Sequence, residues 1–233
     1  MENMSDKKKE IIQKLQRMSG KYSVYAIFDD WVTTFALALA QQIEYKQSRE
    51  DHYLQVIGKY EKEERLELCR LNAMYVEAAE QEMSDILGYI YMHLELGSNR
   101  TGQFFTPYHI CRLMARMALE NEGDREIYKC NEPSCGGGGN IIAFAEELKH
   151  LGKNYQTQMI ATCQDIDVRA VYMCYIQCFF YGIPAIVFQS DTLADPNGEK
   201  SSTGKLLTYG YLKCFWHNFN KYTNLNQQKG EHE

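Results

Sequence analysis

The 233-residue sequence is 45% hydrophobic and 24% charged, and its formal net charge at pH 7 is −6. This composition is ordinary for a globular protein. The negative net charge argues against strong nucleic-acid binding by this protein alone, because such binding needs several lysines or arginines in contact with phosphates. No apolar run reaches the roughly 18 residues of a membrane-spanning helix, and the polar start, MENMSDKKKE, is not that of a secretory signal. We therefore expect a cytoplasmic protein without membrane contact, whose eight cysteines are thiols. Because no two cysteines have the spacing CxxC, we expect no metal site.

Residues 1–98 are predicted to form a helical domain. This part of the chain contains no proline, and its apolar residues recur every three or four positions, as in amphipathic helices, in the stretches 24–43, 60–83 and 83–96. Ser84 or Asp85 is placed to cap the last of these helices. The aromatic and methionine side chains on the apolar stripes suit a hydrophobic core better than a cofactor site. Residues 1–98 alone therefore indicate no chemistry.

After Gly102 the pattern changes to alternating strands and helices. Thr106 can cap a helix whose first turn contains Pro107 and which continues through YHICRLMARMALE. Strand-type and helix-type segments then alternate along the chain, at 126–135, 140–152, 158–167, 168–183 and 185–193. The order β-α-β-α-β predicts a parallel sheet with helical crossovers. We therefore expect an α/β domain over residues 99–220, followed by a polar tail over 221–233.

Four consecutive glycines, Gly136 to Gly139, lie between the first predicted strand and the helix that follows it. In folds of this kind ligands bind beyond the carboxyl ends of the strands, and glycines allow the backbone to approach a ligand closely. Asp165 stands at the end of the second strand, where an acid can accept from both hydroxyls of a ribose. Asp191 stands at the end of the third strand, where it can accept from an adenine amino group. Together these residues predict an adenosyl ligand.

NAD and S-adenosylmethionine are the two adenosyl ligands to be distinguished. The NAD fingerprint GxGxxG opens a helix N-terminus to a diphosphate, but Ile141 or Ile142 stands here where the third glycine should be. Glu132 places a negative charge next to the loop, which suits a ligand with an ammonium or sulfonium group better than a diphosphate. We therefore favour S-adenosylmethionine as the cofactor. The remaining alternative is a glycine-rich turn flanked by ordinary capping acids.

Four motifs also carry a resemblance to a known family. The segments GQFFTP, EPSCGGGGNI, DID and SDTL stand in the order seen in N6-adenine DNA methyltransferases. Over about residues 84–193 the chain resembles the modification subunits of type I restriction systems and small methylase-like proteins of phages and mobile elements. DILGYIYMHL, just ahead of GQFFTP, is similar to the end of the helical domain of those subunits.

The resemblance implies both a fold and an activity. The fold is a Rossmann-like S-adenosylmethionine-dependent methyltransferase core behind a helical domain, and the activity is site-specific methylation of adenine N6 in DNA within a restriction-modification system. DNA is the implied partner, bound with the help of another subunit. A homodimer or a hetero-complex with a specificity protein is the implied assembly.

The resemblance also implies roles for individual residues. Thr106 and Pro107 would lie against the methionine end of the cofactor, and Glu132 would face its ammonium group. Asp165 would bind the ribose hydroxyls and Asp191 the adenine amino group, as their places at the strand ends also predict. Phe105 would pack either beside the cofactor or in the core. The implied cofactor-binding residues are Phe105, Thr106, Pro107, Glu132, Cys135, Gly136, Gly138, Asp165 and Asp191.

The catalytic motif of these enzymes, N/D-P-P-Y/F, does not occur in the sequence. In the family it follows the fourth strand, where it holds and stacks on a flipped adenine. Asp195, in ADPNG, is one candidate for the polar residue, but this segment fits a turn better. Residues 206–219 could supply the fourth strand, with Asn218 and Phe219 as a remnant of the motif, although both prolines are missing. We therefore expect little methyl transfer by this chain alone.

Two other functions remain open. One is a catalytically inactive, cofactor-binding partner or regulator in a restriction-modification or phage system. The other is a NAD-type dehydrogenase, although no His, Lys and Tyr constellation for hydride transfer is recognisable. The predicted sheet has three or four strands where such methyltransferases have seven, so the first strand should lie at or near an edge. We expect residues 206–216 to cover this edge, either by folding beside the first strand or by docking on a second copy of the chain.

Overall fold

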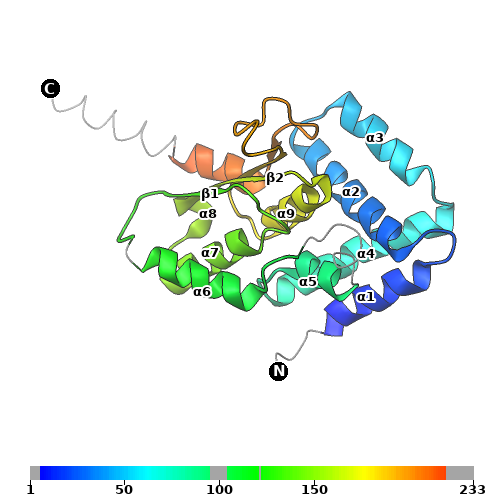
Figure 1. Ribbon diagram of the computed structural model, residues 1–233, viewed down its shortest axis with the longest axis horizontal. Helices are drawn as coiled ribbons and strands as arrows, with labels where there is room; N and C mark the ends of the chain where they lie inside the picture. Colours follow the sequence, from blue (N-terminus) through cyan, green and yellow to red (C-terminus); the bar gives the residue numbers. More distant parts are fainter. Residues whose placement is uncertain (1–5, 95–103, 121, 219–233) are drawn as a thin grey trace.

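The computed structural model describes residues 6–94, 104–120 and 122–218, and the contacts given below are those among them. The first part of the chain is helical and lies on the right of Figure 1. Its helices are α1 (Asp6–Met18), α2 (Val24–Ile43), α3 (Gln47–Ile57), α4 (Lys62–Gln81) and α5 (Ile86–His93). The three predicted helices are confirmed as α2, α4 and α5, whereas α1 and α3 were not predicted individually.

Capping side chains fix where two of these helices begin. Ser23 accepts a hydrogen bond from Ala26 N at 3.2 Å at the start of α2. Asp85, one of the two caps predicted for α5, accepts from Gly88 N at 2.9 Å. Helix α2 is apolar on most of its surface, and most of its residues are buried.

The second part of the chain alternates helices and strands. Its elements are α6 (Tyr108–Leu119), β1 (Tyr128–Glu132), α7 (Gly139–His150), α8 (Tyr155–Gln158), β2 (Met159–Asp165), α9 (Val168–Phe180), β3 (Ala185–Gln189), β4 (Leu206–Leu207) and a helix over residues 209–218. The strands form one sheet in the order β1-β2-β3-β4, with β1, β2 and β3 parallel and β4 antiparallel to β3. Parallel strands joined by α7 and α9 make a Rossmann-like core, so the predicted α/β fold class is confirmed.

The register of the parallel strands brings their carboxyl ends to one edge of the sheet. Glu132 at the end of β1 pairs with Cys163, and Asp165 at the end of β2 pairs with Gln189 at the end of β3. The glycine loop follows β1 at this same edge. Helix α6 differs from its prediction at one point, because its cap is Pro107, whose carbonyl accepts from Ile110 N, and not the Thr106 side chain.

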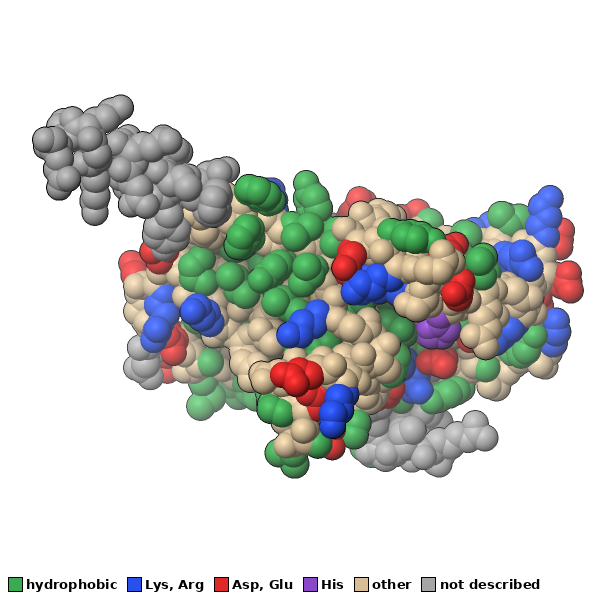
Figure 2. Space-filling model, turned by 90° about the horizontal axis from the view of Figure 1, so that it is seen from above, with side chains coloured by type: hydrophobic (Ala, Val, Ile, Leu, Met, Phe, Trp, Pro, Cys, Tyr) green, Lys and Arg blue, Asp and Glu red, His purple; other side chains and the backbone are tan. Residues whose placement is uncertain are grey.

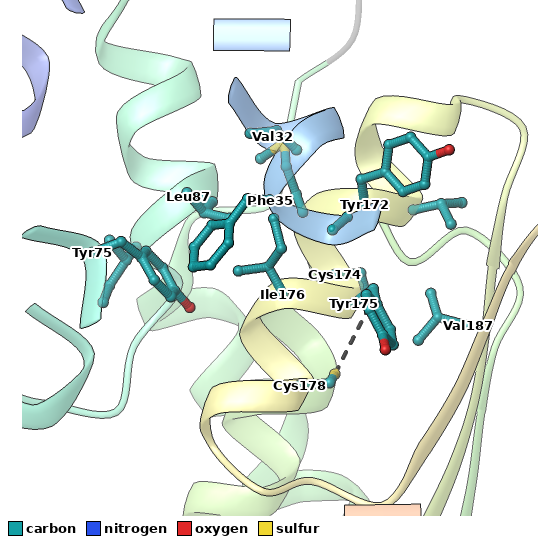
Figure 3. Close-up of a cluster of buried hydrophobic side chains, with 14 of the residues drawn as sticks. Val32, Phe35, Tyr75, Leu87, Tyr172, Cys174, Tyr175, Ile176, Cys178 and Val187 are labelled. Atoms are coloured by element: carbon teal, nitrogen blue, oxygen red, sulfur yellow. Dashed lines mark hydrogen bonds between the residues drawn. The ribbon is translucent and has the colours of Figure 1, made fainter. Parts of the chain in front are cut away.

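Helix α9 lies at the centre of the molecule. It packs on β2 and β3 and also on α2 and α5, and all of its residues from Ala170 to Cys178 are buried. Figure 3 shows Val187 of β3 on one side of α9, and Phe35 of α2 and Tyr75 of α4 on the other. One cluster of buried hydrophobic side chains therefore runs through both parts of the chain.

The segment after β3 does not cover the first strand. Residues Leu206–Leu207 pair with β3, at the opposite edge of the sheet, so within the described residues β1 has a neighbour on one side only. The prediction that residues 206–216 lie beside the first strand is therefore wrong. The predicted fourth strand is present only at Leu206–Leu207, because residues 209–218 form a helix, and docking of this segment on a second copy of the chain stays a prediction. Thr208 gives the physical reason: its Oγ1 donates to Ile183 O at 2.7 Å and accepts from Tyr211 N at 3.2 Å, which ends the strand and starts the helix.

Several large apolar side chains remain exposed on the helix over residues 209–218, among them Tyr209, Phe215 and Trp216. Figure 2, which views the molecule from above, shows hydrophobic side chains gathered on the left of this face. None of the described helices combines the length and the apolar character that crossing a membrane requires.

Candidate cofactor site

The glycine loop is held by backbone hydrogen bonds between neighbouring strand ends. Cys135 N donates to Gln164 O at 2.8 Å, and Gly138 N donates to Cys135 O at 2.8 Å. Gly136 and Gly138 have φ angles of +51° and +96°, which residues other than glycine rarely adopt. A Cβ at Gly136 would lie 2.9 Å from the Phe105 ring. The loop thus needs glycine at these two positions for both its backbone angles and its contacts.

Asp165 joins the end of β2 to the glycine loop. One of its carboxylate oxygens accepts from Gly136 N at 2.8 Å and the other accepts from Asp167 N at 2.9 Å. The side chain is 7% exposed, and burial raises the pKa of its carboxyl group. Each carboxylate oxygen can accept a further hydrogen bond, so Asp165 organises the loop and retains acceptor capacity for ligand hydroxyls.

Glu132 is paired with a residue that the sequence did not single out. Asn140 Nδ2 donates to Glu132 Oε2 at 3.0 Å, and Ser134 N donates to Glu132 Oε1 at 3.4 Å. The other amide atom, Asn140 Oδ1, is buried and has no hydrogen-bond partner in the described part of the chain. Asn140 could have been suspected from the sequence, because it directly follows the four glycines at the start of α7. A buried acceptor without a donor is what a ligand N–H or O–H group would satisfy.

Two adjoining cavities share Phe105 and Thr106 in their walls; the smaller one borders the glycine loop, and the larger one borders α5. The smaller one has a volume of about 80 Å³, and its lining includes Phe105, Thr106, Gly136 and Asn140. The larger one has a volume of about 320 Å³, and Pro107 lies in its wall together with side chains of α5. The structure therefore brings the predicted residues around 105–107 and the glycine loop to one place.

The end of β3 contributes a second group of residues. Asp191 is exposed, and its Oδ1 accepts from Leu193 N at 3.0 Å. Thr192 Oγ1 donates to Pro133 O at 2.5 Å and so ties the end of β3 to the glycine loop. Ile166 and Leu193, which follow the ends of β2 and β3, are 68% and 96% exposed. Neither apolar side chain stands out in the sequence, because single exposed apolar residues are common on protein surfaces.

The catalytic candidates do not lie among the residues that line the two cavities. Asp195 accepts from Lys200 N and Glu199 N, each at 2.9 Å, and forms a turn, and these backbone hydrogen bonds lower the pKa of its carboxyl group. Asn218 Nδ2 donates to Cys214 O at 2.9 Å and to Thr157 O at 3.3 Å, which places it near the start of β2 and away from the carboxyl ends of the strands. Phe219 lies outside the described residues.

All eight cysteines are free thiols, and four of them, Cys135, Cys163, Cys174 and Cys178, are buried together beneath the glycine loop. Cys174 and Cys178 lie one turn apart on α9, with their sulfur atoms 4.0 Å apart (Figure 3). Hydrogen bonds from Cys135, Cys163 and Cys178 lower the pKa of the Cys174 thiol. In the described ranges no three His, Cys, Asp or Glu side chains are grouped as metal ligands. These small side chains instead let α9 approach Gly138, where a Cβ would lie 3.1 Å from the Cys174 sulfur.

Comparison with known proteins identifies the family. No curated protein matches the chain. Among solved structures, it is similar to a type I restriction-modification system methyltransferase subunit from Streptococcus thermophilus, with 12% identity, a TM-score of 0.42, and coverage of 80% of this chain and 59% of that one. It is also similar to a candidate class I S-adenosylmethionine-dependent methyltransferase from Listeria monocytogenes, with 12% identity, a TM-score of 0.49, and coverage of 90% and 69%. A family model described as N-6 DNA Methylase matches residues 78–209, more than half of the sequence, so the chain belongs to the N-6 DNA methylase family.

Proposed function

We propose that this protein binds S-adenosylmethionine through its glycine loop and strand-end acids and acts in the methylation of adenine N6 in DNA. One observation carries the proposal. Gly136 N donates to the Asp165 carboxylate at 2.8 Å, so the glycine loop lies beside the acid for which we propose ribose binding, at the carboxyl edge of the parallel strands. Membership of the N-6 DNA methylase family supports it.

The residues present fit the proposed cofactor. The loop leaves no room for side chains at Gly136 and Gly138, and the buried Asn140 Oδ1 still needs a donor, such as the cofactor's ammonium group. When bound, S-adenosylmethionine would supply an electrophilic methyl group on a sulfonium ion. Glu132 orients Asn140 by accepting from its amide nitrogen, so both the acid and the amide would serve the amino-acid end of the cofactor.

The strand ends would bind the adenosine part. Asp165 would accept from the ribose hydroxyls, and Asp191 would accept from the adenine amino group. Ile166 and Leu193 offer exposed apolar surface at the ends of β2 and β3, which a flat adenine ring would cover. Thr106 and Pro107 border the cavities on the side of α5 and would contact the methionine end.

A second candidate function is a cofactor-binding partner that does not transfer methyl groups alone. The specific observation is that the four prolines, Pro107, Pro133, Pro184 and Pro196, are never adjacent, so the sequence contains no N/D-P-P-Y/F motif. In either function the partners would be DNA and a subunit that contributes sequence recognition. The division into a helical domain, residues 1–98, and a cofactor domain, residues 99–220, is part of the same proposal.

Calorimetric titration tests the proposal directly. The protein is titrated with S-adenosylmethionine, S-adenosylhomocysteine and NAD in separate experiments. We expect binding of the first two and none of NAD. Binding of NAD alone would favour a dehydrogenase, and binding of none of the three would refute the proposed cofactor site.

A further inference from the structure

Asp85 is a buried acid that no step described above uses. It caps α5 in the helical part of the chain and is only 7% exposed. Its Oδ1 accepts from Gly88 N at 2.9 Å and from Gln177 Nε2 at 2.7 Å. Both donors are neutral, and within the described residues no Lys, Arg or His forms an ion pair with this carboxylate. Burial of a carboxylate without a cation is costly, and it raises the pKa of Asp85.

Capping alone does not explain an acid at this position. Ser or Asn caps a helix about as well as Asp and carries no charge into the interior. Lys8 of α1 also lines the larger cavity, but its ammonium group donates to Ser84 Oγ at 3.0 Å and forms an ion pair with Glu82. The charge of Lys8 is therefore already paired.

The second carboxylate oxygen of Asp85 is directed at the glycine loop. Oδ2 accepts no hydrogen bond from the described residues, and it lies against the backbone of Gly88 and Gly139. A Cβ at Gly139 would be 3.1 Å from this oxygen, so glycine at that position leaves it uncovered. Asp85 lines both of the cavities described above, next to Thr106. A negative charge thus borders the space where a ligand's methionine end would lie.

Gln177 of α9 holds Asp85 and the loop in one arrangement. Its Nε2 donates both to Asp85 Oδ1 and to Gly137 O, the latter at 2.6 Å, and its Oε1 accepts from Leu87 N at 3.1 Å. Gln177 is fully buried, so these hydrogen bonds are shielded from water. The position of the acid relative to the glycine loop is therefore fixed.

We propose that Asp85, supplied by the helical part of the chain, is an anionic subsite that binds the positively charged methionine end of the cofactor. The inference rests on the proposed function and deepens it, because it assigns a charge-selective role to a residue outside the sheet. Gln177 is then a positioning residue for both the acid and the loop. The helical part contributes to cofactor binding and is more than a neighbouring domain.

The test compares three ligands of different charge on wild-type protein and on the Asp85→Asn variant. Of the two cationic groups, S-adenosylmethionine carries both the sulfonium and the ammonium, S-adenosylhomocysteine carries only the ammonium, and 5′-methylthioadenosine, which lacks the amino-acid end, carries neither. Asparagine retains the acceptor for Gly88 N and Gln177, and thermal unfolding verifies that the variant is folded. Asp51→Asn, on the exposed surface of α3, is the matched control because it removes the same charge far from the cavities.

We expect Asp85→Asn to weaken S-adenosylmethionine binding by roughly 10- to 150-fold, the range for a hydrogen bond to a charged group, and to leave 5′-methylthioadenosine unchanged. A loss for S-adenosylmethionine alone would assign the sulfonium to Asp85, and a loss shared with S-adenosylhomocysteine would assign the ammonium group. Equal losses for all three ligands, or no loss, would overturn the subsite. Wild-type protein that binds none of the three would instead refute the proposed function, and the subsite with it.

Discussion

Arg169 and Asp29 are 140 positions apart in the sequence, yet Arg169 Nε donates to Asp29 Oδ1 at 2.9 Å. The same guanidinium group donates to Tyr91 OH at 3.2 Å and lies 4.4 Å from the centre of the Tyr25 ring. These contacts connect α9, which follows the second strand, with α2 and α5. They are the polar counterpart of the hydrophobic cluster that crosses between the two parts of the chain.

Arg169→Ala should lower the free energy of unfolding by about 1–3 kcal/mol, from lost hydrogen bonds to a charged group and lost packing on Tyr25. The side chain of Asp29 is 41% exposed, so the ion pair itself contributes the smaller share. Arg169→Lys should recover only part of the lost free energy of unfolding, because lysine lacks the planar guanidinium group with its several N–H donors. Urea unfolding measures the effect, and a change below about 0.5 kcal/mol would show that this connection is dispensable.

Asp165→Ala should weaken binding of S-adenosylmethionine by about 1.5–3 kcal/mol, because it removes a charged acceptor from the ribose hydroxyls. It should also loosen the loop, since Gly136 N loses its acceptor. Asp165→Asn keeps one amide oxygen as an acceptor, so its affinity for S-adenosylmethionine should lie between that of Asp165→Ala and that of the wild type. Calorimetric affinities decide the matter, and unchanged affinity in Asp165→Ala would remove this residue from the site.

Gly138→Ala should destabilise the protein by about 1–3 kcal/mol and reduce cofactor binding. The reason is twofold, since the φ of +96° is unfavourable for alanine and the new Cβ would lie 3.1 Å from the Cys174 sulfur. Gly152→Ala is the matched control, because its φ is +74° but nothing lies within 4 Å of its Cβ position. Equal losses in the two variants would mean that the contact with Cys174 has no cost, whereas we expect the larger loss at Gly138.

The Asp85→Asn variant should be at least as stable as the wild type at neutral pH. Burial raises the folded-state pKa of Asp85 above its ordinary value of 3.8, so this carboxyl group stabilises the fold fully below 3.8, and the contribution is lost as the pH rises through the raised value. The stability of the wild type relative to the variant should therefore increase as the pH falls. Lys8 and Cys174, the other titratable groups that act on Asp85, are present in both proteins. Urea unfolding at several pH values measures the difference, and a pH-independent destabilisation of the variant would point to a purely structural role.

The isolated chain should transfer little or no methyl group to DNA, because it has no N/D-P-P-Y/F motif and neither Asp195 nor Asn218 lines the cavities. Transfer of tritium from labelled S-adenosylmethionine to duplex DNA of mixed sequence is the measurement. Substantial incorporation at adenine N6 would contradict this expectation. Asp195→Ala and Asn218→Ala would then be the first variants to compare.

The order of strands and helices around the site was predictable, because each strand and helix leaves a local pattern. The capped helix after Asp85, the strand ahead of the glycines and the strands ending at Asp165 and near Asp191 all follow from periodicity and from glycine and proline positions. The segment from Leu206 was predicted only in part, because its apolar and aromatic residues fit a strand or a helix equally well. Only the contacts of Thr208 with Ile183 and Ala185 decide between them.

The parts of the site that escaped prediction depend on contacts distant in the sequence. Asp85 was predicted as a cap, but its place beneath Gly137 and Gly139 depends on how α5 packs against α9, which no local pattern encodes. The unpartnered amide oxygen of Asn140 likewise results from how Glu132 and α7 are oriented. Side-chain placement of this kind is determined by tertiary packing.

The central position of α9 also has a consequence for biosynthesis. Helix α2 packs part of its apolar surface against α9, so this part cannot be covered until residues up to about 180 have left the ribosome. The 140 positions between Asp29 and Arg169 correspond to roughly 7–28 s at synthesis rates of about 5–20 residues per second. During that interval Phe35 lacks Phe180, one of its neighbours in the folded chain, and we expect the nascent chain to depend on chaperones until the second half of the polypeptide emerges.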